Sequence, residues 1–296
     1  MVSQRTEAET NALKVTLASW AFVPIWSTGF IGARMGTPYA EPLSFLTLRF
    51  AVAAAGLALL VVLTRSAWPR DWRQTGHICV FGLLAHGGYL GAVFVAIHMG
   101  VTAGVSALIV GLQPLLTGLI APRLLGETVT WRQWAGLLLG LAGVAMVVWQ
   151  KMDFSQGDGL GFGLCVGGLI AITVGTLYQK RFCSDMPLRS GSAIQFMAAG
   201  TATLVGALLL EDFRIEWTGE FVFAFVWLVV VLSWGAVGLL LFLIHNGAAT
   251  KVTSLFYLVP PGAALFGWLL FDESLSPLAI MGFAIAAGGV ALVTRK

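Results

Sequence analysis

The chain has 296 residues, of which 58% are hydrophobic and only 10% are charged, and its mean hydropathy is +0.87. This composition excludes an ordinary soluble globule. The net charge of +3 comes from 17 Lys and Arg against 14 Asp and Glu, a balance too small and too dispersed to indicate nucleic-acid binding. At about 20 residues per span, the sequence predicts an all-α integral membrane protein with ten transmembrane helices.

Charged residues divide the chain into lengths that each fit one span, because a charge at the middle of a bilayer is costly. In chain order, the predicted spans are 15–33, 42–64, 74–97, 101–122, 133–150, 159–179, 190–210, 221–244, 252–271 and 274–294. The uncharged run 74–122 has to fold back once, and we expect its turn at His98-Met99-Gly100. A second turn is expected at His245-Asn246-Gly247.

The distribution of positive charge predicts the orientation. With the N-terminus in the cytoplasm, 13 of the 17 Lys and Arg residues fall in cytoplasmic loops or tails, three fall outside, and Arg49 lies within a span. Cytoplasmic loops of membrane proteins carry such an excess of Lys and Arg. We therefore expect both termini in the cytoplasm.

An internal repeat divides the chain into two halves. His98 and Pro114 recur at an offset of 147 as His245 and Pro261, and later matches follow at an offset of 146. Chance matches among small residues are the alternative explanation for some of these pairs. Five spans per half is an odd number, so the second half enters the membrane from the opposite side and forms an inverted repeat. The expected division is a tail at 1–12, a first repeat at 13–150 and a second at 151–296.

Motifs along nearly the whole chain resemble a known family. They are the Trp26-Ser27-Thr28-Gly29-Phe30 segment, the stretch from Pro42 to Arg49-Phe50, Pro114 followed by Gly126-Glu127, and Pro261 followed by Asp272-Glu273. Together they resemble EamA-type carriers of the drug/metabolite transporter superfamily. The resemblance implies a fold of five plus five helices. Within the family, the sequence is similar in particular to bacterial inner-membrane exporters of amino acids, including aromatic ones. The shared motifs say little about the substrate.

The residues that membrane enzymes need are missing from the sequence. We find no His-Glu-x-x-His zinc motif, no Asp-rich diphosphate motif and no pair of aspartates within spans. Cys79, Cys165 and Cys183 have neither pairing nor metal-ligand spacing. We expect no enzymatic activity, no metal and no cofactor. Because no Asp or Glu lies well inside a predicted span, a carboxylate proton relay has no obvious position, which leaves uniport, exchange or coupling through a histidine.

Polar and aromatic side chains within the spans are the candidates for a solute-binding pocket. His86 and Tyr89 share one helix face, and the repeat mate of His86 at offset 147 is Ser233. A buried imidazole has to face the bundle or a wet cavity, although a histidine that only bridges two helices would do the same. The full candidate set is His86, Tyr89, Ser106, Gln113, Tyr178, Ser233, Trp234, Tyr257, Trp20 and Trp26. For the hydroxyls the alternative is a bond to their own helix, and for the tryptophans it is ordinary packing.

Four prolines and one arginine are candidates for structural roles. Pro24, Pro114, Pro260 and Pro261 each remove a backbone donor within a span, so we expect them to bend helices 1, 4 and 9 and to act as hinges. Arg49 has three open interpretations. It snorkels outward, binds the carbonyl groups of a neighbouring helix, or binds a substrate carboxylate, and the family resemblance favours a structural charge.

The leading hypothesis is a secondary transporter that exports small amphipathic metabolites, above all amino acids, across the bacterial inner membrane by alternating access. The expected partners are the small-molecule solute and the lipid bilayer, and the oligomeric state is open, with a monomer allowed. Two alternatives are an exporter of drug-like or nucleotide-related metabolites with the same fold, and a passive channel.

Overall fold

The structure is a computed structural model that describes residues 2–125, 130–151, 159–236, 238–239, 242–243, 256–273 and 276–294. In the first half of the chain its helices are α1 (Val2–Gly36), α2 (Pro42–Leu63), α3 (Trp72–Gly82), η1 (Leu83–Gly88), α4 (Tyr89–His98), α5 (Ala103–Val110), α6 (Gln113–Leu125) and α7 (Trp131–Lys151). In the second half they are α8 (Gly159–Phe182), α9 (Leu188–Leu210), α10 (Gly219–Val226), η2 (Trp227–Ala236), η3 (Phe256–Leu258), α13 (Val259–Phe271) and α14 (Pro277–Thr294). Within the described ranges the fold is all-helical, as expected, with one isolated β-bridge.

Seven helical stretches are long and apolar enough to cross a membrane: Leu13–Gly36, Pro42–Leu63, Trp72–His98, Ala103–Ile120, Gly159–Phe182, Leu188–Leu210 and Gly219–Ala236. The stretch Trp72–His98 runs through α3, η1 and α4 without interruption. Three further apolar helices are shorter, namely Trp134–Val147, Val259–Phe271 and Pro277–Gly289. The chain is therefore a multi-pass membrane protein.

The first predicted turn is present, and local chemistry explains the helix boundaries around it. α4 ends at His98, and Gly100 has a φ of 103°, a conformation that glycine adopts readily because it has no Cβ. The next helix, α5, begins after Thr102, whose hydroxyl accepts a hydrogen bond from the Val105 N–H at 3.4 Å. The second predicted turn, His245-Asn246-Gly247, lies outside the described residues.

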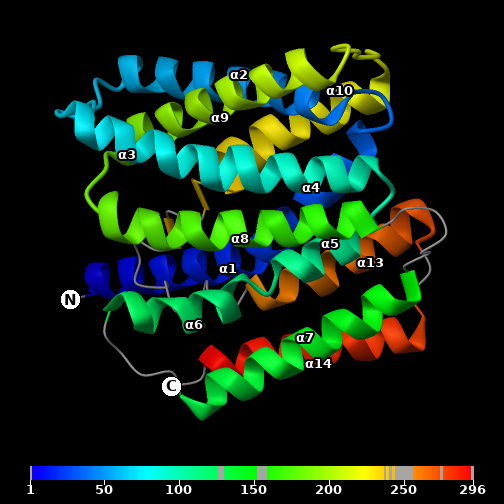
Figure 1. Cartoon of the computed structure of the whole chain (residues 1–296). Helices are drawn as coiled ribbons and strands as arrows, with labels where there is room; N and C mark the ends of the chain where they lie inside the picture. The colour runs from blue at the N-terminus through cyan, green and yellow to red at the C-terminus, as the bar shows by residue number, and fades with distance from the viewer. Residues whose placement is uncertain are drawn as a thin grey trace.

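The helices pack in pairs that join the two halves of the chain (Figure 1). α2 lies along α9, and α7 lies along α14. η1 packs on α8 as η2 packs on α1, and α6 packs on α8 as α13 packs on α1. Exchanging each element for its counterpart in the other half leaves this pattern of pairs unchanged.

The pair of α7 and α14 is held at backbone contact by glycines. A Cβ atom added to Gly143 would lie 2.5 Å from the Gly282 carbonyl oxygen and 2.6 Å from the Ala286 nitrogen. A Cβ atom on Gly289 would lie 2.6 Å from the Gly136 carbonyl oxygen. Small residues let membrane helices approach closely, and the resulting van der Waals attraction holds helices together where lipid provides no hydrophobic driving force.

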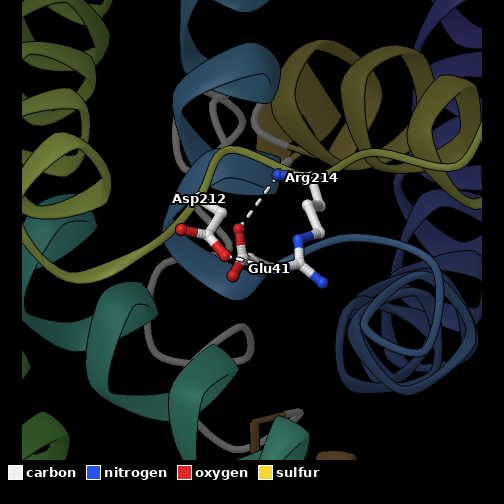
Figure 2. Close-up of polar contacts among 3 residues, drawn as sticks. All are labelled: Glu41, Asp212 and Arg214. Carbon is white, nitrogen blue, oxygen red and sulfur yellow. Dashed lines mark hydrogen bonds and ion pairs between the residues drawn. The ribbon is translucent and has the colours of Figure 1, made fainter.

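At one end of the bundle, backbone groups join the segment between α1 and α2 to the segment between α9 and α10 (Figure 2). Ala40 and Ile215 form an antiparallel bridge. The Glu41 N–H donates to the Arg214 carbonyl oxygen at 3.3 Å, and the Arg214 N–H donates to the Glu41 carboxylate at 2.9 Å. The Arg214 side chain pairs with Asp212. These contacts connect the two halves of the chain.

The start of α2 is capped from the other half. The Glu211 carboxylate accepts hydrogen bonds from the N–H groups of Leu43 and Ser44, both at 2.8 Å, and from the Ser44 hydroxyl at 2.7 Å. A helix begins with N–H groups that lack intrahelical partners and carries a partial positive charge there. A carboxylate in this position accepts hydrogen bonds from the unpaired N–H groups and also balances the partial positive charge.

Candidate solute-binding site

Two π-helical segments lie in the middle of the bundle, one in each half. η1 carries His86, and η2 carries Ser233. The repeat offset of 147 places residues 83–88 on residues 230–235, which lie inside η2. π-helical turns are rare and frequently mark functional sites.

Arg49 lies at the centre of this region. The residue is 6% exposed, and its Nε donates to the Ser233 hydroxyl at 3.2 Å. The rings of Phe50 and Phe94 both lie with their centroids 6.0 Å from the guanidinium carbon. A snorkelling arginine would extend its guanidinium group into water, so the interpretation that Arg49 snorkels outward is wrong. Each cation–π contact contributes about 0.5–2 kcal/mol, whereas removing a charge from water costs several kcal/mol, so the rings offset only part of that cost.

His86, Tyr89 and Gln195 complete a polar cluster around Arg49. The His86 Nε2 lies 3.4 Å from the Gln195 Oε1 of α9. The His86 ring lies 6.1 Å from that of Phe50, and Tyr89 packs on the hydrophobic cluster that contains Phe50 and Phe94, the two rings beside the guanidinium group. The five residues Arg49, His86, Tyr89, Gln195 and Ser233, which we call the central cluster, come from both halves of the chain. Gln195 is absent from the set predicted from the sequence, although it is a single amide in an uncharged span.

Aromatic side chains pack beside the central cluster. The ring of Phe196 lies 4.7 Å from that of His86, and the Trp234 Nε1 donates to the Ala53 carbonyl oxygen of α2 at 3.2 Å. Trp26 packs instead on Phe22 and Phe256, with ring centroids 5.1 Å apart in each pair. The side chain of Tyr257 lies outside the described part of the structure.

Three other predicted pocket residues form hydrogen bonds between α8 and neighbouring helices. These are the Ser106 hydroxyl, which accepts from the Cys165 thiol at 3.6 Å, the Gln113 amide, which donates to Thr176 at 2.8 Å, and the Tyr178 hydroxyl, 2.7 Å from the His77 Nδ1. Each bond attaches α8 to a neighbouring helix. The structure therefore gives these three residues packing partners and does not bring them to Arg49.

Trp20 is also not brought to the cluster, since 78% of its surface is exposed. It precedes Trp26 by six residues, which at 3.6 residues per turn places the two rings on different faces of α1. The sequence alone could not assign these faces because α1 is apolar all round.

In both halves prolines lie in the first turn of a helix. The fourth predicted span divides into α5 and α6, and Pro114 lies in the first turn of α6. Pro260 and Pro261 lie in the first turn of α13. The two breaks approach each other, since a Cβ atom on Gly111 would lie 2.7 Å from the Pro260 side chain. α1, by contrast, continues as one helix through Pro24.

Comparison with known proteins identifies the family. The sequence pattern of the EamA-like transporter family matches residues 15–149 and, a second time, residues 159–295. The chain belongs to the EamA-like transporter family. EamA proteins are membrane transporters, and a non-enzymatic role for this chain is consistent with that membership.

Individual relatives of this EamA protein cover nearly its whole length. It is 29% identical to the uncharacterized inner membrane transporter YedA of Escherichia coli K12, over 94% of this chain and 89% of that one. It is 25% identical to a probable amino-acid metabolite efflux pump of the same organism, over 90% of each chain. A solved crystal structure has a TM-score of 0.67 with it at 21% identity, covering 95% of this chain and 96% of that one. This last likeness supports the fold alone.

Proposed function

We propose that this EamA protein is a secondary transporter that exports small amphipathic metabolites, above all amino acids, across the bacterial inner membrane. The observation that carries the proposal is the central cluster, a set of polar side chains enclosed by Phe50, Phe94 and Phe196 within membrane-spanning helices. Polar groups at this depth are costly in a bilayer and mark solute pathways. Polar groups with apolar walls suit a solute that has one charged and one apolar end.

The proposed architecture has ten spans, with the shorter apolar helices of α7, α13 and α14 completing the set. In this architecture residues 13–150 and 151–296 are inverted five-helix repeats that follow a tail at 1–12. Two observations support it: the helix pairs that persist when the halves are exchanged, and the family match that occurs twice along the chain. Inverted repeats bind their solute near the bilayer midplane, between halves that rock against each other.

The proposed orientation places both termini in the cytoplasm and makes a labelling prediction. A single cysteine at Glu216, in a variant whose three native cysteines are replaced, should react with an impermeant thiol reagent added outside intact cells. A cysteine at Arg70, in the segment between α2 and α3, should react only after the membrane is permeabilised. The reverse pattern would contradict the orientation.

The proposed function predicts counterflow. Proteoliposomes preloaded with an unlabelled amino acid should take up the same labelled amino acid transiently, because a carrier returns from one side to the other loaded. Each amino acid is assayed in turn, and protein-free liposomes are the control. Uptake without stimulation by internal solute would indicate a channel. Stimulation only by nucleosides or drug-like cations would indicate the same fold with a different substrate.

A further inference from the structure

The charge of Arg49 lacks a carboxylate partner among the described residues. The two ion pairs found there join Arg34 to Glu273 and Arg214 to Asp212. A guanidinium group carries five N–H donors. Among the described residues, Arg49 donates one hydrogen bond, from its Nε to Ser233. Arginine is almost never this deeply buried unless it is paired. The bulk of its hydrogen-bonding capacity is therefore available to something other than the described protein groups.

The hydroxyl groups of Ser233 and Tyr89 beside Arg49 carry no charge. Ser233 accepts the bond from Arg49 and donates to the Leu228 carbonyl oxygen at 3.0 Å. Tyr89 packs on the cluster that contains Phe50 and Phe94, the rings that flank the guanidinium group, and in the described part of the chain its hydroxyl has no hydrogen-bond partner. No acidic side chain of the described spans competes for the arginine, because the acid nearest to any span interior is Glu220, in the first turn of α10.

We propose that Arg49, with the Tyr89 hydroxyl beside it, binds the carboxylate of the transported solute within the membrane. This inference rests on the proposed function and names the chemical class of its substrate. The planar guanidinium fork matches a carboxylate in two parallel hydrogen bonds. One guanidinium and one carboxylate cancel in charge, whereas a phosphate dianion would leave a net negative charge at bilayer depth, where charge is costly.

The location of Arg49 between the two halves gives the bond between its guanidinium group and the solute carboxylate a role in transport. The arginine comes from α2 in the first half and bonds to η2 in the second. A carboxylate that takes the place of Ser233 on the guanidinium would separate that contact between the halves. Arg49 is 6% exposed in the described conformation, so solute binding has to displace neighbouring side chains. Binding and movement of the two halves are thus coupled at one residue.

The test compares acids with their carboxamides, which differ only in the proposed ligand group. Purified protein in detergent is titrated with L-phenylalanine or L-leucine, and with L-phenylalaninamide or L-leucinamide, and thermal stabilisation is followed. The wild-type protein should be stabilised by an acid at a concentration at least tenfold lower than by its amide. Arg49→Gln should remove this preference, and Arg49→Lys should keep part of it. The matched control is Arg34→Gln, which removes a cation at the end of α1 and should leave the preference unchanged.

The outcomes separate this inference from the proposed function. Counterflow of an amino acid by Arg49→Gln at the wild-type rate, or equal stabilisation of the wild-type protein by acid and amide, would overturn the carboxylate site and leave the transport function standing. Absence of counterflow in the wild-type protein would overturn both. If Arg49→Gln elutes as an aggregate, Tyr89→Phe takes its place, and a several-fold weaker response to the acid with an unchanged response to the amide is expected. An equal response to both in that variant would contradict the proposal.

Discussion

Replacing Gly143 by alanine should destabilise the protein by about 1–3 kcal/mol, the range measured when extra atoms are forced into a packed core. The new Cβ atom would lie 2.5 Å from the Gly282 carbonyl oxygen, and backbone atoms cannot rotate away as a side chain can. α7 and α14 would have to separate and would pack less closely along their length. Thermal unfolding in detergent, followed by size-exclusion chromatography, measures the effect.

Gly163→Ala is the matched control for Gly143→Ala. Gly163 is an exposed residue of α8, and a Cβ atom there would have no heavy atom within 4 Å. Alanine is favoured over glycine within helices by about 0.5–1 kcal/mol, so this variant should be as stable as the wild type or slightly more stable. Equal effects of the two substitutions would show that α7 and α14 do not approach as closely as the structure indicates.

Replacing Pro114 or Pro261 by alanine should slow transport about tenfold while solute binding changes little. Alanine restores a backbone N–H, which in a continuous helix would bond to the carbonyl four residues earlier. For Pro114 this would join α5 to α6 across the break at Gly111 and Leu112. A straightened helix would favour one of the two transport conformations at the expense of the other.

Because Pro114 and Pro261 occupy equivalent places in the proposed inverted halves, the two variants should shift accessibility toward opposite sides of the membrane. Counterflow measures the rate, and thiol labelling from each side measures the bias. Pro277→Ala is the control, since this exposed proline begins α14 away from both breaks. Loss of solute binding without any bias would mean that the two prolines shape the pocket and do not gate it.

The features that could be predicted from the sequence are those with a local chemical cause. The turn at Gly100 follows from a glycine within an uncharged run too long for one helix, and it is confirmed. The disturbed helices at Pro114 and Pro261 follow from the missing backbone donors, although the structure has a complete break before Pro114 where a bend was expected. The repeat in the sequence makes the positions of His86 and Ser233 equivalent, and the two residues lie in the π-helical segments η1 and η2.

Features that depend on helix faces and distant partners could not be predicted. In a membrane span all faces are apolar, so no periodic pattern tells which side of α1 carries Trp20. Gln195 contacts His86 because α9 packs beside η1, and no pattern in the sequence indicates that these two helices are neighbours. The sequence leaves the role of Arg49 open for the same reason, since its hydrogen-bond partner Ser233 is 184 positions away.

The junction between the segments that flank Ala40 and Ile215 has a consequence for how mutations in this family are read. Its bonds join the Glu41 N–H to the Arg214 carbonyl, the Glu216 N–H to the Tyr39 carbonyl, and the Arg214 N–H to one side chain. An alanine scan leaves every peptide group in place, so of these three bonds it would remove only the one that the Glu41 carboxylate accepts. The main-chain bonds of this junction do not depend on which side chains the two segments carry. Side-chain substitutions therefore leave most bonds of the junction intact, whereas a proline or a one-residue deletion, which alters the main chain, would test them directly.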